Sequence, residues 1–173
     1  METIENKVEK SGLIQISPED YLPQSSEWFL LDFNTTFLDP EFPIVREKEF
    51  RQKLKEYNLP IQNENGPLYL GILLDENTLY PAWLEMLLTS HFFSITPNIE
   101  IGRSEKQILQ KTALKKLQNE SFETYKGKRL IVKGCSKFEI PDFLVHFIRK
   151  HQGAVKSIMF GEACSTVPIF KAK

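Results

Sequence analysis

The sequence predicts an α/β fold: a sheet with parallel βαβ units, a duplicated βαβ repeat and an irregular N-terminal segment. The nearly continuous apolar run from Leu68 to Leu74 is typical of a strand buried on both faces, as in parallel sheets. A helical pattern follows it, beginning at Pro81, and then a second short strand. The same order of strand, proline-started helix and strand recurs between residues 127 and 161. These three observations together indicate the fold class.

The elements that precede the first βαβ unit are shorter. Residues 1–12 are expected to be a loose terminus, and Leu13–Ile16 a short strand. The aromatic-rich run Trp28–Phe33 predicts another strand. Two prolines within residues 34–44 indicate an irregular connection. Over Arg46–Tyr57, apolar residues recur at helical spacing among charged ones, which predicts an amphipathic helix.

The second half of the chain continues the alternation of helices and strands. Strands are predicted at Ile99–Gly102, Arg129–Gly134 and Ser157–Gly161, with a helix at Ser104–Gln118 and another from Pro141. Two strands joined through one helix in the same sheet are parallel. The carboxyl ends of such strands therefore share one edge, where open α/β sheets bind ligands.

The C-terminal tail Val167–Phe170 is expected to be extended, because Pro168 disfavours helix in the residue before it. Proline cannot donate to a strand ladder, so this strand belongs at a sheet edge. An apolar edge strand of this kind is a candidate contact for a homodimer.

The two βαβ units align as an internal repeat over about 66–102 and 127–161, within a single domain that spans 1–173. Pro81 corresponds to Pro141, and His91 corresponds to His151, without a gap in the helix. The alternative is that two unrelated βαβ units share the preference for proline at helix starts. Both interpretations predict parallel strands.

Composition bounds the cellular role. The chain has 173 residues, with 22 basic and 23 acidic side chains and a net charge of −1. This balance predicts neither nucleic-acid binding nor attraction to an anionic membrane. No apolar run is long enough to span a bilayer, and the polar N-terminus does not resemble a secretory signal. We therefore expect a cytoplasmic protein whose cysteines are reduced.

The two cysteines are the candidate metal ligands. Cys135 follows one predicted strand and Cys164 follows the next, so both are expected at the same edge of the sheet. Zinc or an iron–sulfur unit is the cofactor that such thiols would hold, but two thiols cannot close a tetrahedral site. Further ligands would have to come from Asp75, Glu162, Glu139, a second subunit or the metal's cargo. The polar residues expected to bind a ligand at this edge are Asp75, Ser136, Glu162, Ser165 and Thr166.

Two other interpretations of the thiols stay open. A free cysteine is often a small buried hydrophobic residue. Alternatively, Cys135 precedes a helix N-terminus, which favours the thiolate and would suit a nucleophile or a redox thiol.

The histidines are weaker candidates. His91 and His151 end their helices, where they are expected to bond the last carbonyl groups and to suit the helix dipole. His146 lies in mid-helix and is expected to be half-buried or at an interface. No catalytic residue is predicted, and no glycine-rich phosphate loop is present.

Several phrases resemble one family. The C-terminal sequence KSIMFGEACSTVPIFK, with KGC before a proline-started helix, is similar to the bacterial family called domain of unknown function 2480. SGLIQISPEDYLP and VREKEFRQKLKEY resemble it too, so the similarity covers nearly the whole chain. The resemblance implies no activity. It implies an association with iron–sulfur assembly genes and cysteines at positions 135 and 164. Where the family usually has a Cys–Ser pair, this sequence has Leu74 and Asp75.

The function that the sequence favours is that of a non-enzymatic binding or accessory protein. Its partner would be a protein or a small ligand, held at the cysteine edge in metal or iron–sulfur handling. The alternatives are a thiol-dependent enzyme or redox protein that uses Cys135, and a purely structural dimeric module that uses residues 167–170.

Overall fold

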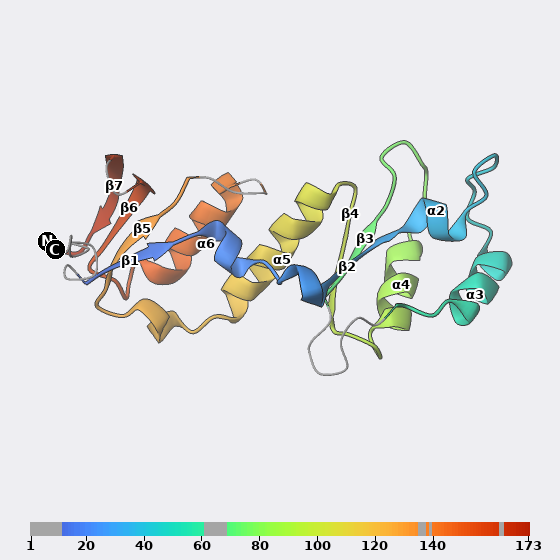
Figure 1. Cartoon of the computed structure of the whole chain (residues 1–173), viewed down its shortest axis with the longest axis horizontal. Coiled ribbons are helices and arrows are strands. Elements are labelled where there is room, and N and C mark those ends of the chain that lie inside the picture. Colours follow the sequence, from blue (N-terminus) through green and yellow to red (C-terminus); the bar gives the residue numbers. More distant parts are fainter. Residues whose placement is uncertain (1–11, 61–68, 135–137, 139, 163–164) are drawn as a thin grey trace, which may run out of the picture. The chain divides into compact units, whose positions relative to one another are not determined.

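The computed structural model describes residues 12–60, 69–134, 138, 140–162 and 165–173 (Figure 1). The chain divides into two compact units. Unit 1 comprises residues 1–22 and 113–173, and unit 2 comprises residues 23–112, so unit 2 is inserted in sequence between the two parts of unit 1. A single domain over 1–173 stays a prediction. The expected α/β class is confirmed, because parallel strands in both units are joined by helices.

Unit 2 is built on a three-stranded parallel sheet. Its strands are β2 (Trp28–Asp32), β3 (Tyr69–Leu73) and β4 (Asn98–Gly102), in the order β2-β3-β4. The central strand β3 aligns with both neighbours, so that Ile72 lies beside Leu31 and Ile101. The side chain of Ile72 is fully buried, which agrees with the apolar run that predicted this strand.

The helices of unit 2 are α2 (Phe33–Phe37), α3 (Glu47–Glu56), α4 (Leu84–Phe92) and the first part of α5 (Glu105–Asn119). The sequence did not predict α2, which occupies the start of the supposed irregular connection. Asp32 ends β2 and caps α2, because its carboxylate accepts a hydrogen bond from the backbone N–H of Thr35 at 3.0 Å.

An aromatic cluster closes the core of unit 2. The ring centroids of Phe33, Phe37 and Phe50 lie 5.4 Å from one another, and all three side chains are buried. Phe33 and Phe37 share one face of α2, four residues apart, and Phe50 comes from α3. The short helix α2 is therefore held by side-chain packing rather than by its length.

Unit 1 is built on a four-stranded mixed sheet. Its strands are β1 (Leu13–Ile16), β5 (Arg129–Val132), β6 (Ser157–Glu162) and β7 (Ser165–Lys171), in that order. The first three are parallel to one another, and β7 pairs antiparallel with β6 at the edge, where its proline was expected.

The helix α6 (Ile140–His151) connects β5 to β6. Its side chains Phe143 and Phe147 are fully buried, as are Leu130 and Ile158, which are neighbours on one face of the sheet. Unit 1 also contains the second part of α5 and two short 3-10 helices, η1 (Pro18–Tyr21) and η3 (Phe122–Tyr125). A third one, η2 (Ser25–Glu27), belongs to unit 2.

The two predicted βαβ units lie in different sheets. β3–α4–β4 belongs to unit 2 and β5–α6–β6 to unit 1, and each forms a parallel strand pair. In each sheet the first strand of the βαβ unit also pairs in parallel with an earlier strand, β2 or β1. This arrangement agrees with a duplication, which remains a hypothesis. Among the residues described, no helix has the length and hydropathy that crossing a membrane requires.

Candidate functional site

The strand directions on which the predicted thiol site depends are as expected. β5 and β6 are parallel neighbours, and Val132, the last residue of β5, lies beside Phe160. Cys135, Ser136 and Cys164 themselves lie outside the described residues, as does Glu139. The described residues that flank them in sequence show where the chain enters and leaves these segments.

Glycines fix the backbone on both flanks. A side chain at Gly134 would meet the ring of Phe160 at 3.0 Å, so the chain after β5 passes close to β6. Gly161 has a φ of +123°, and a Cβ there would collide with the carbonyl oxygen of Ser165. Only glycine accepts both the backbone angle and the close approach at position 161.

Three of the predicted ligand residues come together in the hairpin of β6 and β7. Glu162 pairs with Ser165, and both are exposed, while Thr166 pairs with Gly161 and is half-buried. The Thr166 hydroxyl donates weakly to the sulfur of Met159 at 3.9 Å. Within the part of the chain that the structure describes, the side chains of Glu162 and Ser165 have no hydrogen-bond partner, so both can present oxygen atoms at the carboxyl end of β6.

Asp75 belongs to the other sheet, in the loop that follows β3. Its carboxylate accepts hydrogen bonds from the backbone N–H of Asn77 and from the hydroxyl of Thr78, both at 2.9 Å. Its own N–H donates to the Tyr80 hydroxyl at 2.9 Å. These contacts order the loop, so Asp75 serves the conformation of its own segment.

Arg103 completes this polar network, and no pattern in the sequence predicts its role. Its guanidinium donates to the carbonyl oxygens of Asp75 at 2.9 Å and Thr78 at 3.4 Å, and lies 4.7 Å from the centre of the Tyr80 ring. The Tyr80 hydroxyl donates to the side-chain oxygen of Asn34, which follows β2. The network therefore ties together the chain that follows all three strands of the sheet.

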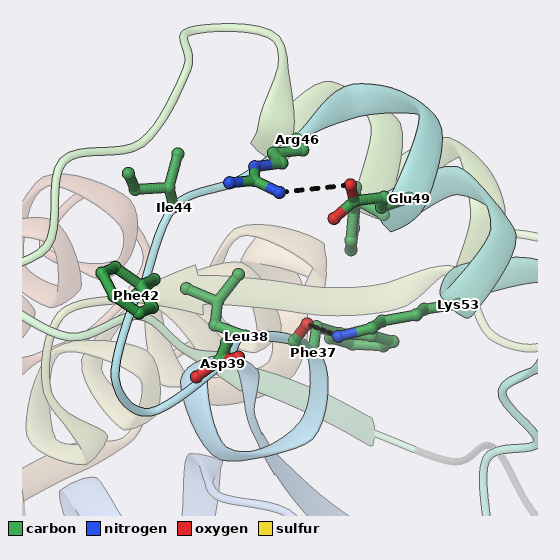
Figure 2. A pocket seen from close by; sticks show the side chains of 9 residues that line it. Phe37, Leu38, Asp39, Phe42, Ile44, Arg46, Glu49 and Lys53 are labelled. Atoms are coloured by element: carbon green, nitrogen blue, oxygen red, sulfur yellow. Dashed lines mark hydrogen bonds and ion pairs between the residues drawn. The ribbon is translucent and has the colours of Figure 1, made fainter.

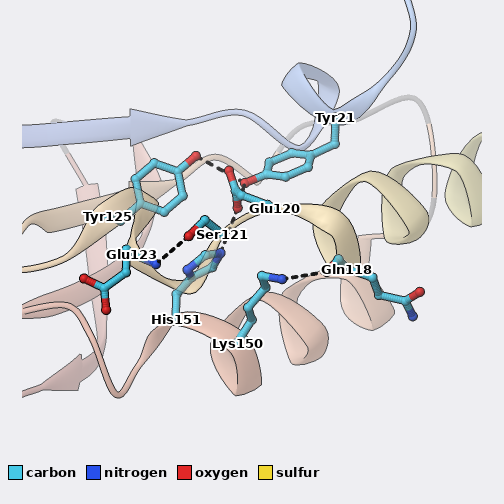
Figure 3. Close-up of polar contacts among 8 residues, drawn as sticks. All are labelled: Tyr21, Gln118, Glu120, Ser121, Glu123, Tyr125, Lys150 and His151. Atoms are coloured by element: carbon cyan, nitrogen blue, oxygen red, sulfur yellow. Dashed lines mark hydrogen bonds and ion pairs between the residues drawn. The ribbon is translucent and has the colours of Figure 1, made fainter. Parts of the chain in front are cut away.

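A second network, in unit 1, is centred on the carboxylate of Glu120 (Figure 3). It accepts a hydrogen bond from the Tyr21 hydroxyl at 3.0 Å and lies 2.9 Å from Nε2 of His151. The hydroxyls of Tyr21 and Tyr125 are 3.2 Å apart. The network joins η1, the residue that follows α5, η3 and the last turn of α6.

The expected role of His151 as a helix cap is wrong. Its side chain is fully buried and bonds Glu120 rather than a carbonyl of its own helix. Because a carboxylate can only accept, Nε2 carries the proton that it donates. Nδ1 is buried without a hydrogen-bond partner among the described residues. Neither helical spacing nor charge pattern could reveal a partner that lies 31 positions away.

Burial controls the protonation of this network. It lowers the pKa of the His151 imidazole from the ordinary 6.5, and the nearby Glu120 carboxylate opposes that change. Burial also raises the pKa of the Tyr21 hydroxyl, with further contributions from Tyr125 and Glu120, and burial raises that of Tyr125. A neutral imidazole and two protonated phenols thus surround one carboxylate. Their hydrogen bonds hold together the elements that carry them, and the His151 side chain is shielded from solvent.

His91 differs from its counterpart in the aligned helix. Its ring is half-buried and meets the edge of Phe92 with centroids 4.9 Å apart. Burial lowers its pKa, and within the described chain its side chain makes no hydrogen bond to a carbonyl.

A small cavity of about 210 Å³ lies in unit 2 between α2, the loop after it and α3 (Figure 2). Phe42 and Ile44 on this loop are 66% and 64% exposed. The Lys53 ammonium group lines the cavity and donates a hydrogen bond to the carbonyl oxygen of Phe37 at 2.8 Å. Arg46 forms an ion pair with Glu49 at 3.4 Å. The fourth charged lining residue, Asp39, accepts a hydrogen bond from the backbone N–H of Glu41 at 2.9 Å, so each charged side chain that lines the cavity already has a partner.

Metal ligands do not gather elsewhere in the described chain. Among residues 12–60, 69–134, 138, 140–162 and 165–173, no group of three or more His, Cys, Asp or Glu side chains could hold a metal ion.

Comparison with known proteins gives one match. Residues 2–172 match the family described as "Protein of unknown function (DUF2480)". Neither the curated proteins nor the solved structures contain a match.

Proposed function

We propose that this chain, which belongs to the family of proteins of unknown function DUF2480, is a non-enzymatic binding protein. It holds a soft metal ion or an iron–sulfur unit at the thiols of Cys135 and Cys164. The observation that carries this proposal is the parallel pairing of β5 with β6. The family description names no activity, so it neither supports nor opposes the proposal.

The register supports a short distance between the two thiols. Val132 and Phe160 are direct partners, and each cysteine follows its strand within a few residues. Neighbouring strands lie about 4.8 Å apart. The close approach of Gly134 to Phe160 and the turn conformation of Gly161 both keep the chain near this edge.

The number of thiolate ligands favours transient binding of a metal ion over its permanent storage. Two thiolates leave a tetrahedral ion with two open positions. The exposed Glu162 and Ser165 offer oxygen atoms, which are weaker ligands than thiolates for a soft metal. An ion held in this way would exchange readily with a partner that supplies further ligands.

Cobalt(II) titration under anaerobic conditions tests the proposal. We expect the wild type to bind one ion per chain with a thiolate-to-cobalt charge-transfer band, and zinc to displace it. The variants Cys135→Ser and Cys164→Ser should each lose much of the band, and the double variant all of it. Because the Asp75 carboxylate is engaged in its own loop, Asp75→Asn is the matched control and should bind as the wild type does.

Two results would count against a thiol site. One is the absence of any charge-transfer band from a folded wild type. The other is a double cysteine variant that binds cobalt as tightly as the wild type. Circular dichroism of each variant shows whether the fold is retained.

A further inference from the structure

The overall charge of the chain conceals a strongly basic segment. Residues 113–173 contain 12 Lys and Arg but only 5 Asp and Glu, although the whole chain has a net charge of −1. Exposed members of this set gather on unit 1, where β5 and β6 begin and β7 ends: Lys128, Arg129, Lys156, Lys171 and Lys173. Among the described residues none of the five has an ion-pair partner.

Strand register explains why these side chains meet. Ser157 of β6 has Arg129 of β5 as its partner on one side and Lys171 of β7 on the other. Direct partners in adjacent strands project from the same face of a sheet, so both cations flank Ser157. Lys156 is held between the same strands, because its N–H donates to Lys128 and its carbonyl accepts from Ala172.

Four of these five residues line a groove, namely Arg129, Lys156, Lys171 and Lys173. The groove has a volume of about 580 Å³, and none of the described residues that line it is acidic. Met159 and its strand partner Pro168 form an apolar floor, and both are partly covered or exposed. The volume lies in the range of small-molecule sites, about 300–1,000 Å³.

We infer that this groove binds a nucleotide, with its phosphate groups on Arg129 and Lys171 and its base on Met159 and Pro168, which project from the same face of the sheet. Guanidinium and ammonium groups are the side chains that hold phosphate oxygens. A thioether and a proline ring offer an apolar surface to a flat ring. Because the cations converge at one end of the strands instead of forming a track across the sheet, the arrangement favours a compact anion over a nucleic-acid strand.

This site is separate from the proposed thiol site. The groove lies where β5 and β6 begin, whereas Cys135 and Cys164 follow the residues where these strands end. The double cysteine variant should therefore bind nucleotide as the wild type does, and failure of one proposal leaves the other intact.

Isothermal titration with ADP in magnesium-free buffer at low salt tests the inference. We expect saturable binding by the wild type and a loss of about tenfold or more in affinity for Arg129→Gln and Lys171→Gln, the effect expected for a charged hydrogen bond. Lys133→Gln removes the same charge at the opposite end of β5 and should change the affinity by less than about twofold. Adenosine and inorganic pyrophosphate should each bind more weakly than ADP, because each lacks half of the contacts.

Four outcomes would overturn the inference. The first is that ADP does not bind at millimolar concentration, and the second is that Arg129→Gln and Lys133→Gln lose affinity equally. The third is that pyrophosphate binds as tightly as ADP, and the fourth is that a single-stranded oligonucleotide binds more tightly than ADP. The third would leave a simple anion site, and the fourth would indicate a nucleic-acid surface.

Discussion

At the scale of single residues, His151 shows how a tertiary contact replaces a local rule. A histidine in the last turn of a helix ordinarily suits the negative end of the helix dipole in its charged form. Here the ring is fully buried beside Phe147 and Tyr125, with centroids 4.8 and 5.0 Å away. Desolvation disfavours the charged form, so the histidine acts as a neutral donor to Glu120.

This arrangement predicts a dependence of stability on pH. Because the folded-state pKa of His151 lies below the unfolded value of 6.5, the unfolded chain binds more protons as the pH falls through and below 6.5. The free energy of unfolding should therefore be greatest above that pH and decrease below it. In His151→Gln, which keeps an N–H donor but cannot titrate, the decrease should be smaller.

Urea unfolding followed by circular dichroism at a series of pH values measures this difference. His91 is retained in both proteins and contributes in the same direction, because burial lowers its pKa too. Equal losses of stability in the wild type and in His151→Gln would show that His151 is not responsible.

At the scale of elements, the strands were predictable and one helix was not. The apolar run of β3 and the parallel pairing of β5 with β6 follow from hydrophobic pattern and chain connectivity. The helix α2 has five residues, too few for a periodic pattern, and it depends on the Asp32 cap and on packing with α3. Such packing is absent from the local sequence.

The edge strand β7 carries the prediction of a dimer. In the sheet order it has β6 as its only neighbour among the described strands, and Val167 and Ile169 are 58% and 51% exposed. An exposed apolar edge can pair with a second copy. We expect the wild type to be a dimer by light scattering, and Val167→Lys to shift its mass toward the monomer.

Val145→Lys is the matched control, since Val145 is 48% exposed but belongs to α6. A wild-type monomer, or an unchanged dimer in Val167→Lys, would exclude this edge as the contact.

At the scale of the whole molecule, the sequence suggested one domain, and the chain forms two compact units. The insertion of unit 2 between the two parts of unit 1 could not be predicted from the sequence. It depends on the pairing of β1 with β5, more than a hundred positions later, and no local pattern encodes such a partner. The basic groove was hidden for a related reason: net charge averages over both units, whereas binding depends on where the charges lie. Of the predicted site, the strand directions are confirmed and the thiols remain a prediction.

Because the helix α5 contains residues of both units, we expect their unfolding to be coupled. This helix is continuous over Glu105–Asn119 and places a fully buried residue in each unit, Ile108 in unit 2 and Leu117 in unit 1. Because helix formation is cooperative, we expect loss of either unit to destabilise the other. Both tryptophans, Trp28 and Trp83, belong to unit 2, so fluorescence follows that unit alone.

We expect the urea transition seen by tryptophan fluorescence to coincide with that seen by far-ultraviolet circular dichroism, as it would in a single domain. His151→Gln, which changes unit 1, should shift both transitions together. Two separate transitions would instead identify two independent domains.

The central claim is that two parallel strands bring the thiols of Cys135 and Cys164 to one edge of a sheet, where both bind the same ion. X-ray absorption spectroscopy of the zinc-loaded protein tests this claim most directly. We predict two sulfur neighbours about 2.3 Å from the zinc, the distance of a zinc–thiolate bond. A first shell made only of nitrogen and oxygen atoms would contradict it.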